Sequence, residues 1–122
     1  MKNDLIQEMY LSKENFYFSL EREMFKNAIR ENNKSILDIG CGTGALGLFL
    51  RTNQNCNVFG IEINNAAFQE AEKNLDGVIE GNVETIDIPY KNNEFDYIVM
   101  GDVLEHLINP MGTTKKLIKL LK

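Results

Sequence analysis

The stretch SILDIGCGTG, residues 35–44, constrains the fold of this chain more than any other part of the sequence. Its short apolar run contains Asp38, and glycines follow at positions 40, 42 and 44. Glycine adopts positive φ angles and lets another group approach the backbone closely, so the pattern predicts a strand that turns sharply into a helix. We expect the backbone N–H groups of this loop to face outward, with the positive end of the helix dipole behind them. Such a loop suits a polar or negatively charged ligand, and a plain strand-to-helix turn would explain the glycines as well.

Strands and helices are expected to alternate along the rest of the chain. An amphipathic helix is predicted over 13–31, where apolar side chains recur at helical spacing. Further strands are predicted at 57–63, 77–82 and 95–101. Further helices are predicted at 43–51, at 65–75 with Asn64 as the cap, at 103–108, and from Pro110 onward. This alternation predicts an α/β fold with a parallel sheet, helices on both faces and ligands at the carboxyl ends of the strands.

The length and charge of the chain limit its class. With 122 residues, the sequence predicts one domain over 1–122, with an N-terminal helical segment over 1–33. The formal net charge of -5 argues against a protein that grips nucleic acid through its phosphates. A basic run is interpreted as the solvated face and last turn of a helix; it comprises Lys115, Lys116, Lys119 and Lys122.

The cysteines and the apolar runs bear on the cellular compartment. Cys41 and Cys56 are interpreted as free thiols of a reducing compartment, because neither belongs to a CxxC pair. No histidine cluster accompanies them, so no metal site is expected. The N-terminus lacks the apolar run of a signal peptide, and no run approaches the ~18 apolar residues of a membrane span. We therefore expect a cytoplasmic protein without a membrane partner.

Glu62 strengthens the interpretation of the glycine loop as a binding loop. It closes the second predicted strand, roughly twenty residues after the loop, where an acid accepts both hydroxyls of a ribose in dinucleotide folds. The stretch GTGALG, residues 42–47, also satisfies the nicotinamide-dinucleotide pattern GxGxxG, although its first glycine lies two positions later than that pattern requires. Close packing of a helix on the sheet is the alternative explanation of Gly47.

Three motifs in order resemble the class I S-adenosylmethionine-dependent methyltransferases, in particular methyltransferase domains of type 11/12. They are ILDIGCGTG, FGIEIN and EGNVETIDIPYKNNEFDYIVMGDVLEHLINP, and the resemblance covers about residues 10–122. It implies a Rossmann-like, doubly wound and mainly parallel sheet in a three-layer αβα arrangement. The family's sheet normally has seven strands, and its C-terminal antiparallel strands are missing from this sequence. We therefore expect a chain that stops after the fourth strand of the family.

The resemblance implies S-adenosyl-L-methionine as the cofactor and S-adenosyl-L-homocysteine as the product. Residues that would lie along the methionine portion are Asp38, Gly40, Gly42, Gly44, Met100 and Gly101. Residues that would hold the nucleoside are Glu62 at the ribose, Ile63 on the adenine face, Asn82 at the adenine amino group and the Val83 N–H at a ring nitrogen. Relatives more often have Asp where this chain has Asn82. Tyr17 would match an aromatic residue at the mouth of the cofactor site.

No catalytic residue is fixed by the motifs. His106 is the only histidine, and its unperturbed pKa of ~6.5 would suit a general base. The alternative is that VLEHL begins a helix that Asp102 caps, with His106 in a structural role beside Glu105. A general base is needed only where the methyl acceptor carries a proton of high pKa.

Three functions remain open at this point. The first is a methyltransferase, or its cofactor-binding part, with a small-molecule or glycan-type acceptor and no nucleic acid. The second is an NAD-dependent oxidoreductase, from GTGALG and Glu62. The third is a cofactor-binding module without catalysis. We also expect self-association through the predicted fourth strand, since an apolar strand without a neighbour on one side pairs readily with other chains.

Overall fold

The computed structural model describes residues 24–101 and 103–122. The chain divides into two compact units, residues 1–30 and residues 31–122. In the first unit, residues 24–28 are helical, which agrees with the end of the helix predicted over 13–31. The earlier part of that helix, together with Tyr17, lies outside the described residues. The strands, and the helices that follow the first strand, belong to the second unit, residues 31–122.

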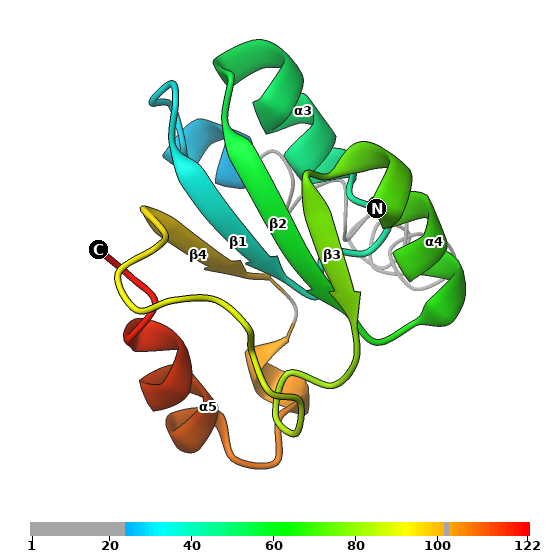
Figure 1. Cartoon of the computed structure of the whole chain (residues 1–122), viewed down its shortest axis with the longest axis vertical. Helices are drawn as coiled ribbons and strands as arrows, with labels where there is room; N and C mark the ends of the chain where they lie inside the picture. The colour runs from blue at the N-terminus through cyan, green and yellow to red at the C-terminus, as the bar shows by residue number, and fades with distance from the viewer. Residues whose placement is uncertain (1–23, 102) are drawn as a thin grey trace, which may run out of the picture. The chain divides into compact units, whose positions relative to one another are not determined.

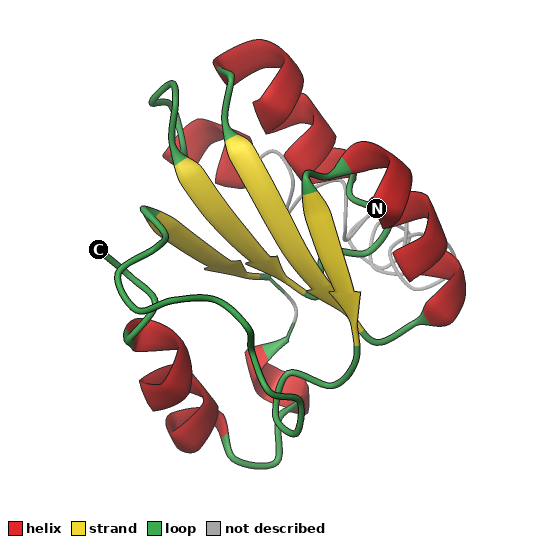
Figure 2. Cartoon of the chain, viewed as in Figure 1, coloured by secondary structure: helices red, strands yellow, loops and turns green. Residues whose placement is uncertain are grey.

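Four parallel strands form the sheet of this unit (Figures 1 and 2). They are β1 (Ser35–Ile39), β2 (Asn57–Glu62), β3 (Gly77–Glu80) and β4 (Tyr97–Met100). Their order in the sheet is β3-β2-β1-β4, so β1 and β2 lie at the centre. In the register of the central pair, Leu37 lies opposite Phe59 and Asp38 opposite Gly60. The predicted α/β fold with a parallel sheet is confirmed.

Helices cover both faces of the sheet. Helix α3 (Ala45–Gln54) contacts β2, and α4 (Asn65–Asn74) contacts β2 and β3. On the opposite face, α5 (Pro110–Ile118) and the turn after it bury Leu117 and Leu120 against Leu37 and Ile61. Side chains alternate between the faces of a strand, so Asp38 and Glu62 point to the α3 side while Leu37 and Ile61 point to the α5 side. The result is the expected three-layer αβα arrangement.

Several element boundaries differ from the predicted ones. Helix α3 begins at Ala45 rather than near residue 43, because Gly44 has the left-handed φ of 83° and cannot continue a right-handed helix. The helix predicted over 103–108 is only a short 3₁₀ turn, η1 (Leu104–His106). Asp102, its expected cap, lies outside the described residues. Helix α5 begins at Pro110 as predicted, and the Asn109 side chain accepts a hydrogen bond from the Gly112 N–H.

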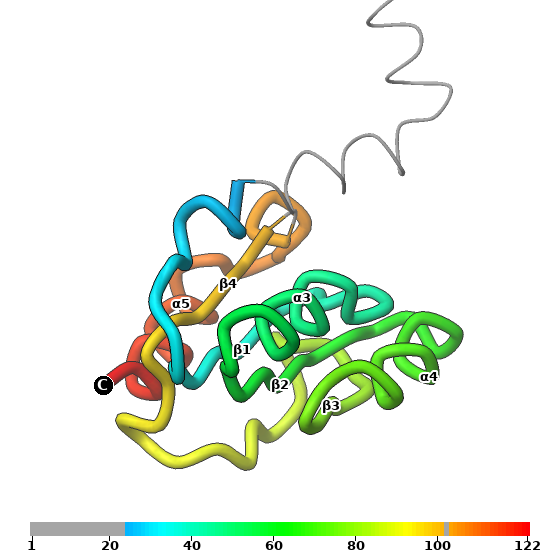
Figure 3. The backbone as a smooth tube through the Cα atoms, turned by 90° about the horizontal axis from the view of Figure 1, so that it is seen from above, coloured from blue at the N-terminus to red at the C-terminus, as the bar shows by residue number. Residues whose placement is uncertain are grey.

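The long connection between β3 and β4 runs from one edge of the sheet to the other (Figure 3). It carries Tyr90 and leads to Phe95, which pack edge to face with ring centroids 5.1 Å apart. Burial raises the pKa of the Tyr90 hydroxyl to about 12. Phe95 is fully buried and forms an isolated parallel bridge with Leu121. It is therefore not the first residue of β4, although the sequence predicts a strand from residue 95. Among the described residues, β4 itself pairs only with β1.

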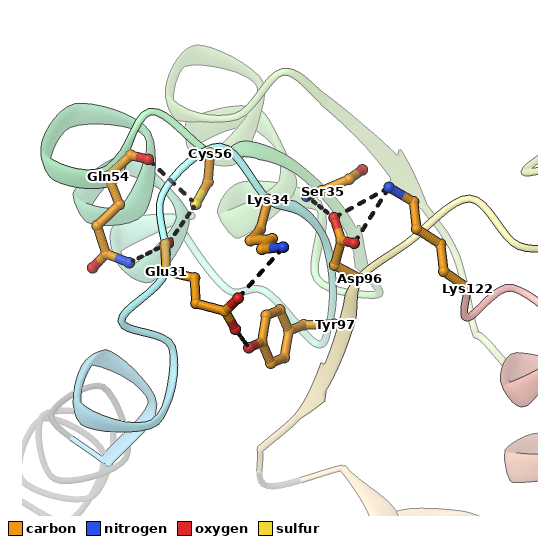
Figure 4. A network of polar contacts seen from close by, with 8 residues as sticks. All are labelled: Glu31, Lys34, Ser35, Gln54, Cys56, Asp96, Tyr97 and Lys122. Carbon is orange, nitrogen blue, oxygen red and sulfur yellow. Dashed lines mark hydrogen bonds and ion pairs between the residues drawn. The ribbon is translucent and has the colours of Figure 1, made fainter.

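A polar network joins distant segments at the amino ends of β1 and β4 (Figure 4). The Asp96 carboxylate accepts a 2.8 Å bond from the Ser35 N–H and lies 3.3 Å from the Lys122 ammonium group. The Tyr97 hydroxyl donates to the Glu31 carboxylate, which also pairs with Lys34.

In the described part of the chain, no helix is long and apolar enough to cross a membrane.

Candidate functional site

The loop between β1 and α3 is held by hydrogen bonds to β2. The N–H groups of Gly40 and Cys41 donate to the Ile61 carbonyl at 2.7 and 3.2 Å. The Gly42 N–H donates to Glu62 Oε1 at 2.8 Å. The expectation that these loop amides face outward is therefore wrong. The amides turn toward β2 because the loop bends back over the end of that strand, and this fixes the position of Glu62.

The glycines of this region differ in what lies beside them. Gly40, Gly42 and Gly44 all have positive φ angles, of 71°, 59° and 83°. A Cβ atom at Gly40 would lie 2.5 Å from the Val103 side chain, and one at Gly44 would lie 3.1 Å from Leu75. A Cβ atom at Gly42 would meet nothing within 4 Å. Gly42 is thus the glycine of this triplet that borders open space, as a ligand-facing position requires.

Gly47 has a packing role. A Cβ atom there would collide with the Leu75 side chain and would lie 2.8 Å from Val58. The absence of a side chain therefore lets α3 lie close to β2 and to the end of α4. This confirms the packing explanation, so the match of GTGALG to the dinucleotide pattern needs no nicotinamide cofactor to account for its last glycine.

Two buried carboxylates lie at the carboxyl ends of β1 and β2. Asp38 is 6% exposed and Glu62 is 8% exposed, and they share one face of the sheet. Burial foremost, and then the negative charges of Asp38 and Glu62, raise the pKa of the Cys41 thiol. Both acids therefore lie near Cys41. Burying two carboxylates costs free energy, which is a burden that binding sites commonly carry.

The segment after β2 continues this site. Glu62 Oε2 accepts a 2.9 Å bond from the Asn64 N–H, so each oxygen of the carboxylate has a backbone donor. Ile63 follows with 67% of its surface exposed, although it is a large apolar residue. Asn64 caps α4 as predicted, since its side chain accepts from the Ala67 N–H at 3.0 Å. An exposed apolar side chain beside a fixed carboxylate suits a ligand with a flat apolar ring next to hydroxyl groups.

Asn82 and Val83 lie in a tight turn after β3. Asn82 Oδ1 accepts a 2.9 Å bond from the Glu84 N–H, and the Asn82 carbonyl accepts from the N–H groups of Thr85 and Ile86 at 3.0 Å. The Val83 side chain is buried in the core. Val83 can therefore offer a ligand only its backbone, as the resemblance implies. The Asn82 oxygen is already used once, and its second lone pair is what a ligand donor could reach.

Two residues that sequence reasoning missed hold this turn. Glu84 accepts hydrogen bonds from the N–H groups of Ile108 and Asn109, at 3.1 and 2.8 Å, and these bonds lower the pKa of its carboxyl group. Lys116 donates to the Val83 carbonyl at 2.9 Å. Lys116 was expected on a solvated helix face, and this is wrong because α5 packs against the turn. No local pattern marks either residue, since their partners are 24 to 33 positions away.

The remaining candidates lie after β4 or outside the described residues. Met100 ends β4 and Gly101 follows it, and both are partly buried. His106 has a 71% exposed side chain, with Nε2 3.8 Å from a Glu105 carboxylate oxygen. Among residues 24–101 and 103–122, no three His, Cys, Asp or Glu side chains form a group that could hold a metal ion. Cys41 and Cys56 are both buried free thiols.

Comparison with known proteins gives two kinds of match. A tRNA1(Val) (adenine(37)-N6)-methyltransferase of Haemophilus influenzae is 42% identical over 48 residues, which are 38% of this chain and 21% of that protein. A protein arginine N-methyltransferase 1 of Chlamydomonas reinhardtii is 33% identical over 94 residues, which are 60% of this chain and 27% of that protein. The matches thus span about a quarter or less of these curated relatives.

Solved structures share the fold at low sequence identity. A TehB-like SAM-dependent methyltransferase of Corynebacterium glutamicum superposes with a TM-score of 0.67 at 21% identity, over 97% of this chain and 68% of that one. The [4+2]-cyclase SpnF superposes with a TM-score of 0.71 at 20% identity, over 83% of this chain and 40% of that one. The family model described as a methyltransferase domain matches residues 37–122, which include the glycine loop, Glu62 and the turn at Asn82. The chain therefore belongs to the methyltransferase domain family, of the class I type that its motifs resemble.

Proposed function

We propose that residues 31–122 bind S-adenosyl-L-methionine at the carboxyl ends of β1 and β2, as part of a methyltransferase. The observation that carries the proposal is the pairing of Gly42 with Glu62. The Gly42 backbone borders open space, and its N–H group fixes a buried carboxylate at 2.8 Å. A ribose needs such a fixed acceptor for its two hydroxyl groups, and a ligand chain needs backbone without side chains beside it.

The proposed roles follow the length of the cofactor. Glu62 would accept the ribose hydroxyls, and Ile63 would cover one face of the adenine ring. Asn82 and the Val83 N–H would meet the edge of the adenine. The residues along the methionine portion would be Asp38, Gly40, Gly42, Gly44, Met100 and Gly101. Tyr17, which the resemblance would place at the mouth of the site, lies outside the described residues.

Methyl transfer requires these residues to position the cofactor and the methyl acceptor. The cofactor supplies an electrophilic methyl group, so the protein has to hold the acceptor in line with it at close range. The buried acids and the bonded loop amides are preorganised, because Glu62, Asn64 and the glycine loop are already joined by hydrogen bonds. In this proposal His106 is not the general base, since its side chain is largely exposed.

The acceptor class is proposed from the residues that follow the carboxyl ends of the strands, which we call the rim of the site. One relative is named as a tRNA methyltransferase and another as a protein arginine methyltransferase, so the comparisons do not support the exclusion of nucleic acid. The stretches 40–44, 62–65, 80–88 and 101–109 follow the carboxyl ends of the strands and contain acids but no Lys or Arg. Lys116 reaches this rim, and its ammonium group is used by backbone carbonyls. We therefore propose an uncharged small-molecule or glycan-type acceptor rather than a polyanion.

The test is isothermal titration of the chain with S-adenosyl-L-homocysteine and, in parallel, with NAD. We expect S-adenosyl-L-homocysteine to bind with a Kd near ~10 μM, about 7 kcal/mol, and NAD to bind more weakly. The Glu62→Ala variant should weaken binding by about 100-fold, because a charged hydrogen-bonding partner is removed. Tight binding of NAD alone would favour the oxidoreductase alternative.

A second candidate function is a cofactor-binding module without methyl transfer. The observation in its favour is that the fold is shared with SpnF, which is named as a [4+2]-cyclase. A panel of small-molecule, glycan, RNA and protein acceptors with radiolabelled cofactor separates the two. Transfer to any acceptor supports the methyltransferase, whereas cofactor binding without transfer to any of them supports the module.

We also propose that two copies associate through β4. The described residues pair this strand only with β1, so its other edge presents backbone donors and acceptors. Phe95 and Leu121 occupy the edge just before β4, which limits the free part to Tyr97–Met100. Light scattering over a range of concentrations should show a dimer, and a monomer at high concentration would contradict the proposal.

A further inference from the structure

Four hydrogen bonds join the turn at residues 82–86 to α5 and to the segment that leads into α5, although these parts are far apart in the sequence. Two of them come from Glu84, whose carboxylate accepts from the backbone N–H groups of Ile108 and Asn109. The other two come from Lys116, whose ammonium group donates to the carbonyls of Val83 and Ile86. We call these two side chains, Glu84 and Lys116, the turn brace.

The brace holds the turn from two sides. Glu84 projects from the turn to the segment that leads into α5, with bonds of 3.1 and 2.8 Å. Lys116 projects from α5 to the turn, with bonds of 2.9 and 3.0 Å to carbonyls near the start and at the end of the turn. Each charged group binds backbone rather than another side chain, and charged hydrogen bonds of this kind are among the stronger ones in proteins.

The turn has little freedom of its own once it is braced. The Asn82 carbonyl accepts from Thr85 and Ile86, and the Asn82 side chain accepts from Glu84. A Cβ atom at Gly81 would lie 2.5 Å from the Ile86 side chain, so the backbone before the turn is packed against it. A shift of α5 would therefore carry Asn82 and Val83 with it as one unit.

We propose that Glu84 and Lys116 are positioning residues for the base of the bound nucleoside, through the turn that carries Asn82 and Val83. This inference rests on the proposed function, in which Asn82 and the Val83 N–H meet the edge of the adenine. Neither side chain touches the cofactor. They fix the distance between the turn and the rest of the site, and recognition of one base edge over another depends on that distance.

The readout that separates positioning from general stabilisation is base selectivity. S-inosyl-L-homocysteine differs from S-adenosyl-L-homocysteine at the base edge, where a carbonyl replaces the amino group. The wild-type chain should prefer the adenosyl compound. A loose turn should lose that preference, whereas a general loss of stability would weaken both compounds alike.

The experiment measures Kd values of both compounds by titration calorimetry for the wild type, Glu84→Ala and Lys116→Met. Selectivity is the Kd of S-inosyl-L-homocysteine divided by the Kd of S-adenosyl-L-homocysteine. Each brace variant should lower this ratio by about fivefold. Lys116→Arg should restore most of the selectivity, since it keeps donors for the two carbonyls. Glu72→Gln and Lys115→Met are matched controls, because both remove a charge from an exposed surface position and should leave the ratio unchanged.

A second measurement keeps the proposal testable if a variant is unstable. Amide hydrogen exchange of Ile108 should speed up in Glu84→Ala and stay slow in Glu72→Gln, as observed by NMR at a temperature where both variants are folded. Selectivity retained in both brace variants would overturn this inference while the proposed function stands. Absence of binding of either compound to the wild type would overturn both.

Discussion

Polar side chains lie at both ends of the sheet, but their surroundings differ between the carboxyl ends and the amino ends of the strands. At the carboxyl ends, Asp38 and Glu62 are buried, and Glu62 is bonded to two backbone amides beside the open side of Gly42. At the amino ends, Asp96 and Glu31 belong to a network that reaches Lys122 and Tyr97 (Figure 4). Both networks join segments that are far apart in the sequence.

The difference lies in the free energy that each arrangement costs. A buried carboxylate loses its hydration and recovers only part of that loss from hydrogen bonds, so two of them beside open space favour a binding role. The amino-end acids keep more contact with water, since the side chains of Asp96 and Glu31 are 19% and 56% exposed, so they lose less hydration on folding. The amino-end network joins distant segments of the chain, whereas the burial of the carboxyl-end acids supports the proposed binding site.

The sharpest test replaces one acid of each end by its amide. Glu62→Gln should weaken binding of S-adenosyl-L-homocysteine by about 30-fold, because the amide offers one acceptor oxygen where two were used. Asp96→Asn should leave that binding unchanged and lower the Tm by no more than about 3 °C. Titration calorimetry and thermal unfolding on both variants measure the two effects. Equal losses of affinity would show that the ends of the sheet are not functionally distinct.

A second test separates the two glycines at the ends of GTGALG. Gly42→Ala adds a methyl group toward open space at a positive φ, so it should weaken ligand binding by about tenfold while costing only about 1 kcal/mol of stability. Gly47→Ala inserts a methyl group between α3, Leu75 and Val58, which should cost about 1–3 kcal/mol of stability. Urea unfolding and calorimetry together distinguish the outcomes. A destabilised Gly42→Ala that binds normally would remove Gly42 from the site.

A smaller effect is expected for the hydrogen bond between Tyr97 and Glu31. The Tyr97 hydroxyl foremost, and then Lys34, lower the pKa of Glu31, and the same bond raises the pKa of Tyr97. Because the pKa of Glu31 is lowered in the folded state, Glu31 stabilises the fold above its unfolded pKa of 4.5. This stabilisation is lost as the pH falls through the folded pKa of Glu31. Because the pKa of Tyr97 is raised in the folded state, Tyr97 stabilises the fold below its unfolded pKa of 10.0. This stabilisation is lost as the pH rises through the folded pKa of Tyr97.

The Tyr97→Phe variant tests that pH window. It should lower the Tm by less than about 3 °C between pH 5 and pH 9, because the pair is exposed. The difference from the wild type should shrink below the folded pKa of Glu31 and above that of Tyr97. A constant difference at all pH values would mean that other contacts of the hydroxyl group, rather than its hydrogen bond to the Glu31 carboxylate, account for the loss.

Much of the fold was accessible from the sequence because local signals marked it. The apolar runs of β1 and β2, the cap at Asn64 and the proline at the start of α5 each specify an element by themselves. The boundaries near Gly44 and Phe95 were missed because they depend on a left-handed φ and on pairing with Leu121. Pairing between segments that are distant in the sequence leaves no local pattern.

The candidate site divides in the same way. Gly42 and Glu62 follow from their spacing, and the structure brings them into contact. The direction of the loop amides was missed, because only the position of β2 decides it. Glu84 and Lys116 were missed for the same reason, since an acid in a turn and a lysine in a basic run resemble ordinary surface residues until α5 is packed in place.

The smallest effect is expected for His106, the residue whose type most suggests catalysis. Its side chain is 71% exposed and lies 3.8 Å from Glu105 on a short 3₁₀ turn, far from the burial that tunes a general base. His106→Ala should therefore change cofactor binding by less than about twofold and methyl transfer, once an acceptor is known, by less than about tenfold. The matched variant Glu105→Gln should behave alike. A loss above ~10³-fold in His106→Ala, in a variant that still binds the cofactor, would assign proton transfer to the imidazole. The positioning account of the site would then need a base.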